Sequence, residues 1–192
     1  MQEKNEDRRT RKTKAVLQQS LIALLREKNL QDISVTELTQ LADVNRGTFY
    51  SHYQSIFDLA AQMEHEMFLE FKAVMDAYPS AALRGGIEPI LRAIFRFISK
   101  NADLCAVLLT GEVENAFLRR LKEDVYRRVM EEWGGLYGLD ALPQTDYYMS
   151  FLVDGFIGLL RAWERGGRRE GPEEMARLAG RLIEYGLQPS RL

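Results

Sequence analysis

Helical periodicity, interrupted at short intervals by capping and stop signals, extends along the whole of this sequence. Apolar residues recur every three or four positions, as Leu17, Leu21 and Leu24 do, and this spacing is typical of one face of an α-helix. No strand-like alternation of any length appears, and no NG or DG pair stands where a hairpin turn would need it. The sequence therefore predicts an all-α fold of about nine helices.

The expected helices begin and end at recognisable residues. Ser34 and Glu37 form a capping box, in which the serine accepts a backbone hydrogen bond and the glutamate can return one. Asp43 and Asn45 suit a tight turn, and Asn45 can also cap the helix that follows. We expect helices at about residues 9–28, 35–41, 46–53, 55–77, 87–100, 101–109, 112–133 and 145–165, with the last helix opening at Pro172.

The charge of the chain differs between its two parts. A formal net charge of −2 argues on its own against a nucleic-acid-binding protein, since such domains are often basic. Residues 1–53, however, carry nine Lys/Arg against seven Asp/Glu, whereas the remainder carries 17 against 21. Residues 8–14 (RRTRKTK) hold five basic side chains and no acidic one. We expect one domain over residues 1–54 and a second domain over residues 55–192.

Several classes of protein are disfavoured by what the sequence lacks. The single cysteine, Cys105, allows no intrachain disulfide and fits a reducing compartment. No apolar run approaches the ~20 residues of a membrane span, and no apolar signal-peptide segment is evident. Phosphate-binding loops, nucleophile triads and metal-ligand clusters are also missing. We therefore expect a cytoplasmic protein that is not an enzyme, has no membrane partner, and holds no cofactor or metal.

The three N-terminal helices, the second and third of which are joined by the turn at 43–45, make a helix-turn-helix unit. The third helix is short and polar on one face, and a helix about 10 Å across fits the ~12 Å major groove of DNA. The side chains expected to be buried in this unit are Val35, Leu38, Val44 and Phe49.

The stretch ISVTELTQLADVNRGTFYSHY, residues 33–53, resembles the DNA-binding domain of the TetR/AcrR (tetracycline-repressor-like) family of bacterial transcription regulators. The most specific part of the match is RGTFY followed by HY, and the similarity covers about residues 9–60. The length of the chain and its all-helical remainder are also similar to that family. The resemblance implies a sequence-specific regulator whose partner is an operator in double-stranded DNA.

The resemblance implies a role for most polar residues of the third helix and for the basic run. Thr36, Arg46, Gly47 and Thr48 would face the base edges. Arg46 is the main candidate for direct readout, because a guanidinium can bond guanine O6 and N7 together. Tyr50, His52 and Tyr53 would donate to phosphates, a contact that fixes the register, or pack near them. The basic run, which includes Arg8 and Lys14, would reach the DNA backbone or the adjacent minor groove. The expected DNA-binding set is Thr36, Asn45, Arg46, Gly47, Thr48, Tyr50, Ser51, His52, Tyr53, Arg9, Arg11 and Lys12.

The resemblance also implies a homodimer formed by the last two long helices. Gly155 and Gly158 each cost roughly 1 kcal/mol of helix propensity relative to alanine, which favours close approach of two helices. We expect interface residues at Phe151, Gly155, Gly158 and Trp163, and an effector pocket at Met67, Phe71, Phe95, Tyr126 and Phe151. The predicted function is a repressor that a small-molecule effector releases from DNA. The alternative is a DNA-bound adaptor whose C-terminal domain binds a protein partner and has no metabolite pocket.

Three positions depart from the pattern of the family. Asp43 stands where the family usually has glycine, and we expect the turn to survive because Asp tolerates left-handed backbone. Thr39 replaces a small alanine. Ile56 replaces the usual lysine at the start of the fourth helix, which removes one expected phosphate contact.

Overall fold

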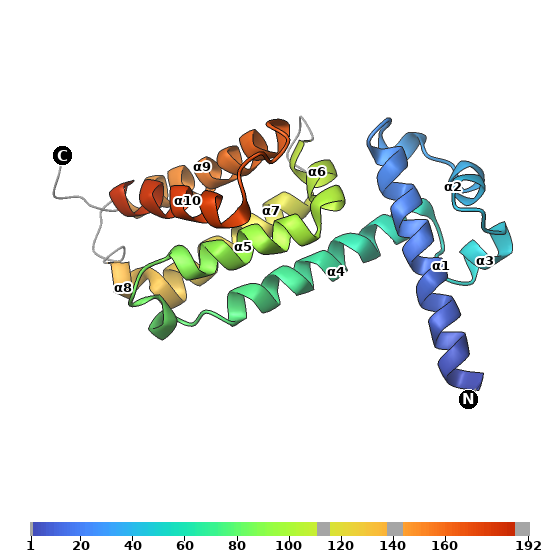
Figure 1. Ribbon diagram of the computed structural model, residues 1–192, viewed down its shortest axis with the longest axis horizontal. Coiled ribbons are helices and arrows are strands. Elements are labelled where there is room, and N and C mark those ends of the chain that lie inside the picture. Colours follow the sequence, from blue (N-terminus) through green and yellow to red (C-terminus); the bar gives the residue numbers. More distant parts are fainter. Residues whose placement is uncertain (1, 111–115, 138–143, 187–192) are drawn as a thin grey trace. The chain divides into compact units, whose positions relative to one another are not determined.

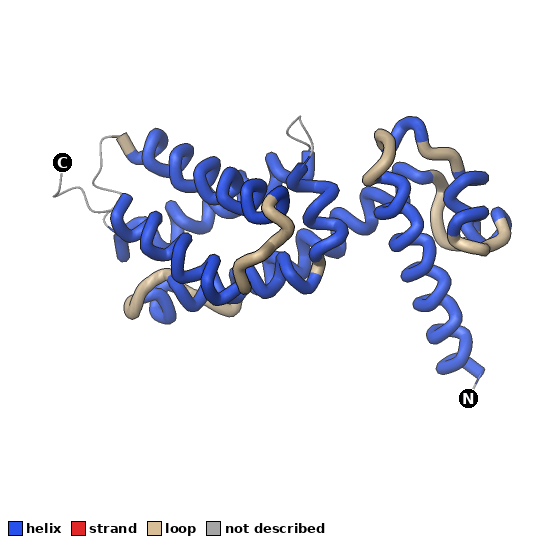
Figure 2. The backbone as a smooth tube through the Cα atoms, turned by 45° about the horizontal axis from the view of Figure 1, so that its top comes forward, coloured by secondary structure: helices blue, strands red, loops and turns tan. Residues whose placement is uncertain are grey.

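The computed structural model describes residues 2–110, 116–137 and 144–186 of the chain. Over these ranges the regular structure is entirely helical, which confirms the all-α prediction (Figures 1 and 2). The α-helices are α1 (Gln2–Leu25), α2 (Val35–Leu41), α3 (Arg46–Tyr50), α4 (Ile56–Asp76), α5 (Glu88–Lys100), α6 (Ala102–Thr110), α7 (Ala116–Arg128), α8 (Gly134–Tyr137), α9 (Thr145–Arg165) and α10 (Pro172–Gly186). Short 3-10 turns cover Leu30–Asp32 and Ser80–Leu83, and a π-helical turn, Val129–Trp133, joins α7 to α8.

The chain divides into two compact units, Met1–Met67 and Phe68–Leu192. The division falls inside α4, so the two halves of this helix belong to different units. The domain boundary that we expect from the sequence, between residues 54 and 55, lies just before α4 and stays a prediction. Among the described residues, no helix combines the length and the apolar character that a membrane span requires.

Capping bonds set the starts of the short helices in the first unit. The Ser34 hydroxyl accepts from the backbone N–H of Glu37 at 3.1 Å, as the sequence predicts for the start of α2. The Glu37 carboxylate does not complete the box but pairs with Lys28 Nζ at 2.5 Å. Asn45 Oδ1 accepts from the backbone N–H of Gly47 at 2.7 Å, which confirms Asn45 as the cap of α3.

The turn between α2 and α3 keeps the geometry that glycine usually provides. Asp43 has a φ of 52°, in the left-handed region that Asp tolerates better than most residues. The backbone N–H of Val44 donates to the carbonyl of Thr39 at 3.0 Å, so the last turn of α2 is hydrogen-bonded into the turn. The expectation that the turn survives without glycine is confirmed.

The core of the first unit is small and apolar. Its fully buried side chains include Leu17 and Leu21 from α1, Leu38 from α2, Phe49 from α3 and Leu59 from α4. Val35 and Val44, which we also expected in this core, are only half-buried. Each of these four helices therefore contributes at least one fully buried side chain to the core, and the burial of Phe49 holds α3 in place.

In the second unit, α10 lies along α5 (Figure 1). A Cβ atom added at Gly180 would meet Leu91 Cδ1 at 3.7 Å, which shows how closely the two helices pass. Arg96 on α5 also binds Glu173 on α10 at 2.7 Å. The packing of α10 therefore combines apolar contact with a surface ion pair.

The continuation of α7 differs from the sequence prediction. Gly134-Gly135 is expected to end this helix, but the chain stays helical to Tyr137 through the π-helical turn and α8. A glycine within a helix costs only about 1 kcal/mol, which the burial of Trp133 can offset. The expected start at Glu112 lies outside the described residues. Counting α7 to α8 as one segment, the described chain has nine α-helical segments, the predicted number.

Candidate nucleic-acid interface

The N-terminal end of α3 presents polar groups to solvent. Arg46 and Gly47 are exposed, and Thr48 is half-buried. Asn45 is exposed as well, but its Oδ1 atom is occupied by the cap bond to Gly47. The first residues of a recognition helix are those that meet the base edges in a helix-turn-helix complex. The exposed end of α3 therefore has the composition and the accessibility that this role requires.

The opposite side of α3 is anchored by aromatic residues. Phe49 is 0% exposed, and its ring lies 5.7 Å from that of Tyr53. Tyr53 is only 2% exposed, so its side chain belongs to the core rather than to the exposed surface expected for a phosphate contact. Burial raises the pKa of Tyr53 to about 12, with smaller contributions from the nearby carboxylates of Glu66 and Asp58. Tyr53 therefore supports α3 as a neutral phenol.

The remaining predicted contacts around α3 lie at or near the surface. Thr36, Tyr50 and Ser51 are exposed, and His52 is half-buried. The Ser51 hydroxyl donates to the carbonyl of Thr48 at 2.7 Å, so its proton is already engaged within the helix. Tyr50 is about half exposed, and its ring contacts Phe49 edge-on.

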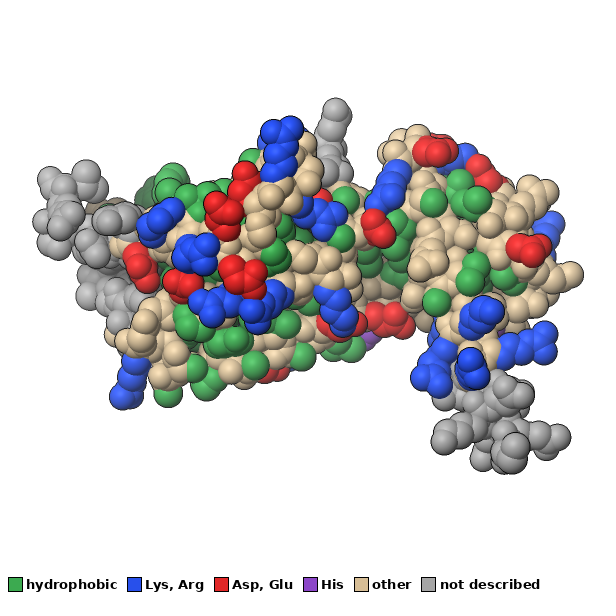
Figure 3. Space-filling model, in the orientation of Figure 1, with side chains coloured by type: hydrophobic (Ala, Val, Ile, Leu, Met, Phe, Trp, Pro, Cys, Tyr) green, Lys and Arg blue, Asp and Glu red, His purple; other side chains and the backbone are tan. Residues whose placement is uncertain are grey.

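The basic run lies on a helix rather than on an extended arm, because α1 begins at Gln2 instead of near Arg9. Lys and Arg side chains gather around the N-terminal part of α1 (Figure 3). The exposed basic residues there are Arg8, Arg9, Arg11 and Lys12. Lys14 differs from them: it is half-buried, with Nζ 5.9 Å from the centre of the Tyr53 ring. Lys14 thus helps to hold α1 against the end of the helix-turn-helix.

The first turn of α4 has no lysine to offer a phosphate. Ile56 is buried in the core of the first unit. The Ser55 hydroxyl accepts from the N–H of Asp58 at 3.1 Å, and Asp58 accepts in turn from the N–H of Gln54 at 2.8 Å. The bond from Gln54, followed by a bond from the Gln62 side chain, lowers the pKa of Asp58. This end of α4 is therefore stabilised by capping and apolar burial.

The expected dimer residues on α9 fall into two groups. Phe151 is 73% exposed, and Gly155 and Gly158 are exposed with open space where a Cβ would stand. Trp163 is instead buried, and its Nε1 donates to the carbonyl of Glu170 at 3.0 Å. Trp163 therefore supports α9 and the following loop from inside the unit.

The expected pocket residues lie in different surroundings. Phe71 pairs with Phe97, and Phe95 is wholly buried against Phe156 and Trp163. Three other members complete the set: Met67 belongs to the first unit, Tyr126 donates its hydroxyl to Asp146, and Phe151 faces solvent. The pocket stays a prediction.

Cys105 is a buried residue of α6. Burial raises the pKa of its thiol to about 12, and the nearby Glu164 carboxylate adds to this shift. A thiol that stays protonated is a poor nucleophile, so Cys105 behaves as a small apolar side chain.

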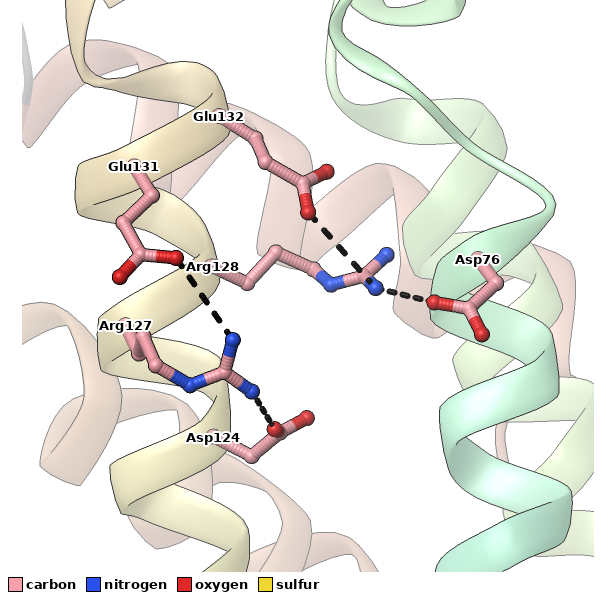
Figure 4. Close-up of polar contacts among 6 residues, drawn as sticks. All are labelled: Asp76, Asp124, Arg127, Arg128, Glu131 and Glu132. Carbon is pink, nitrogen blue, oxygen red and sulfur yellow. Dashed lines mark hydrogen bonds and ion pairs between the residues drawn. The ribbon is translucent and has the colours of Figure 1, made fainter.

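Sequence reasoning missed a group of charged residues on α7. Arg128 is buried, and it reaches Asp76 at the end of α4 (Figure 4). The spacing of Asp124, Arg127 and Arg128 places them on one side of a helix, but it does not reveal which of them is buried.

The chain resembles known regulators along most of its length. A family model of TetR proteins, described as "Transcriptional regulator C-terminal region", matches residues 86–185, about half of the chain. No curated protein matches the sequence.

Solved structures share the fold. A TetR transcriptional regulator from Streptococcus agalactiae is 24% identical and has a TM-score of 0.60, over 93% of this chain and 97% of its own. The fatty acid degradation regulator FadR from Bacillus halodurans is 13% identical with a TM-score of 0.66, over 93% and 96% of the two chains. NalD from Pseudomonas aeruginosa, the secondary repressor of a multidrug efflux pump, is 18% identical with a TM-score of 0.60, over 92% and 97%.

Proposed function

Since the chain belongs to the TetR family of transcriptional regulators, we propose that it acts as a homodimeric repressor that reads a specific operator through α3 and leaves the DNA when a small molecule binds its C-terminal domain. The observation that carries the DNA-binding role is the exposed polar end of α3 on a rigid apolar base. Arg46 and Gly47 face solvent, while Phe49 and Tyr53 are buried beneath them. A base-reading helix needs both features, because its side chains must be accessible and its position must be fixed.

In this proposal the two copies of α3 enter the major groove at two half-sites. Half-sites in helix-turn-helix dimers lie about 34–36 Å apart, or at a multiple of that distance. The proposed DNA-contacting residues are those expected from the sequence, except that Tyr53 and Lys14 make no direct contact with DNA. Tyr53 instead holds α3 in position, and Lys14 holds α1 in position. The exposed basic residues of α1 would add affinity that does not depend on sequence.

Two proteins of the same fold support the proposed repression and the proposed release by an effector. NalD is named as the repressor of an efflux pump, and a FadR regulator from Bacillus subtilis was crystallised with stearoyl-CoA. For this chain we infer a control in which a small molecule bound outside the DNA-binding unit changes the affinity for the operator. Such a ligand acts only through its different affinity for two conformations of the protein.

Helix α4 would carry the change, because each of its halves is embedded in one unit. In the first unit, Glu66 on α4 accepts from Gln18 on α1 at 3.1 Å. In the second unit, the guanidinium of Arg120 lies 4.0 Å from the ring centre of Phe68. A displacement of the second half of a continuous helix would therefore be transmitted to the helix-turn-helix.

Arg9→Ala tests the sequence-independent part of DNA binding. Each protomer would lose about one phosphate contact, so the slope of log affinity against log salt should fall by about 0.9 per protomer, or about 2 for the dimer. The measurement is fluorescence anisotropy on DNA from upstream of the protein's own gene, repeated over a range of salt concentrations. Arg26→Ala, which removes the same charge beyond the other end of α1, is the control. An unchanged slope for Arg9→Ala, or an equal fall for both variants, would contradict the proposed contact.

Phe151→Ala tests the proposed dimer interface. The ring is 73% exposed in the protomer, so its loss should change protomer stability by less than about 0.5 kcal/mol. If the ring is a hot spot of the dimer, its loss should weaken association by at least about 2 kcal/mol, or about 30-fold. Sedimentation equilibrium gives the dissociation constant, and Leu69→Ala, another exposed apolar truncation, serves as the control. A dimer that is equally stable with and without the Phe151 ring would refute this interface.

A further inference from the structure

A cluster of six charged residues joins α7 to the end of α4 (Figure 4). Arg128 projects across the space between the two helices and binds Asp76, the last residue of α4. Its Nη2 atom also lies 3.8 Å from Glu132. One turn earlier on α7, Asp124 accepts from Arg127, which in turn lies 3.6 Å from Glu131.

This cluster and Trp133, which follows Glu132 in the chain, leave buried polar atoms without hydrogen-bond partners. Within the described part of the chain, five buried side-chain polar atoms lack a partner, and three of them belong to Asp124, Arg128 and Trp133. The atoms are Asp124 Oδ2, Arg128 Nε and Trp133 Nε1, and each of these residues is at most 9% exposed. The other two are on α5 and α9. Native structures leave few such atoms, so three along one helical segment call for an explanation.

The π-helical turn brings the three residues to one side of the helix. Asp124 and Arg128 are four residues apart and share a face of α7. Trp133 is five residues beyond Arg128, a spacing that would turn it away in an α-helix. In a π-helix the backbone bonds join residues five apart, so Trp133 returns to the side of Arg128. By this spacing the two unpaired donors and the unpaired acceptor belong to residues on one face of the helical segment.

The charges and the unpaired atoms together select the kind of molecule that fits. Four carboxylates and two guanidinium groups give the cluster a formal charge of −2, which disfavours an anion. A cation supplies only donors and would leave the Arg128 and Trp133 N–H groups unpaired. A neutral group with a carbonyl oxygen beside an N–H or O–H can pair with all three atoms. A primary carboxamide has this arrangement.

We propose that Asp124, Arg128 and Trp133 form a binding site for a small neutral ligand that carries a carbonyl next to a hydrogen-bond donor, such as a carboxamide. The carbonyl accepts from Arg128 Nε and Trp133 Nε1, and the amide N–H donates to Asp124 Oδ2. This site rests on the proposed function and gives the effector a chemical class and a position. Because Arg128 also binds Asp76, a ligand that draws on this guanidinium acts directly on the end of α4.

The test uses the full-length protein and three probes of nearly the same shape: benzamide, benzoate and benzylamine. The chain has two tryptophans, so its indole N–H signals in a proton–nitrogen NMR spectrum are easily assigned. Benzamide at about 1–10 mM, the affinity range of a small fragment, should shift the Trp133 signal in a saturable manner. Benzoate and benzylamine should shift it at least about fivefold less at equal concentration, because neither can pair with all three atoms. The Trp163 signal should not move, since its N–H is already bonded to Glu170.

Trp133→Phe removes one donor and keeps an aromatic ring, and it should weaken benzamide binding by about two- to tenfold. Trp163→Phe is the matched control and should leave benzamide binding unchanged. Circular dichroism shows whether each variant is folded. If one of them is not, the titration of the wild-type protein with the three probes still tests the site. Two results would overturn the proposal. In the first, 10 mM benzamide leaves the Trp133 signal unshifted, which means that water alone fills the site. In the second, all three probes shift the Trp133 signal equally.

Operator titrations separate this inference from the proposed function. Tight, selective binding to upstream DNA without any response of Trp133 to benzamide would reject the ligand site and keep the regulator. A saturable benzamide response in a protein that binds no upstream DNA selectively would keep the site and reject the operator role.

Discussion

Arg46→Ala should abolish most of the selectivity of this protein for its operator. A bidentate contact from arginine to guanine contributes about 1–3 kcal/mol of discrimination, and the proposed homodimer would make the contact twice. The expected loss is therefore about 2–6 kcal/mol, or about 30-fold to 10⁴-fold in affinity for the operator. Binding to unrelated DNA should fall far less, since it depends mainly on phosphate contacts. Anisotropy titrations with operator and scrambled duplexes at one fixed salt concentration give both affinities.

Arg46→Lys is the matched variant for this prediction. Lysine keeps the positive charge but lacks the planar pair of donors that bonds O6 and N7 together. We expect Arg46→Lys to lose much of the selectivity and to keep the affinity for scrambled DNA. If Arg46→Ala weakened both duplexes equally while Arg46→Lys restored both, Arg46 would be a phosphate contact and the assignment to base readout would be wrong.

Phe49→Ala should remove most of the stability of the helix-turn-helix. The ring is completely buried in the core of the first unit, and truncation of such a residue costs about 3–5 kcal/mol. Whole domains are stable by only about 5–15 kcal/mol, so the first unit should melt at a temperature lower by more than about 10 °C. Operator binding should fall with it, because α3 loses the packing that holds Arg46 in position. Thermal unfolding followed by circular dichroism, with anisotropy at 20 °C as the second readout, measures both effects.

Phe57→Ala is the same substitution eight residues away, at a ring that is 59% exposed on the first turn of α4. Its effect on stability should stay within about 0.5 kcal/mol. Equal destabilisation by the two variants would show that burial in this core does not control the stability of the unit.

Most of the local structure could be predicted from neighbouring residues alone. The caps at Ser34 and Asn45 and the left-handed turn at Asp43 depend on backbone groups within a few positions of each side chain, and the structure confirms all three. The helix-turn-helix and its family could be recognised for the same reason, because the motif is a continuous run of residues.

Other predictions failed where distant contacts outweigh local preference. Gly134-Gly135 is a stop signal by propensity, yet the helix continues there beside a buried Trp133. The motif also does not reveal that Tyr53 is buried, with Lys14 near its ring. Neither result can be read from a window of sequence, since burial depends on which segments pack together.

The helical class, the capped starts of α2 and α3, and the polar end of α3 at Arg46 can all be predicted from the residues alone, because these features follow from backbone hydrogen bonding and side-chain type over short spans. Which of those side chains are accessible, and which charges meet, depends on how the helices pack. Arg128 and Asp76 are 52 residues apart in the chain, and their pairing exists because α7 packs beside α4. An arginine is usually exposed, so its burial is a property of that packing and not of the sequence around it.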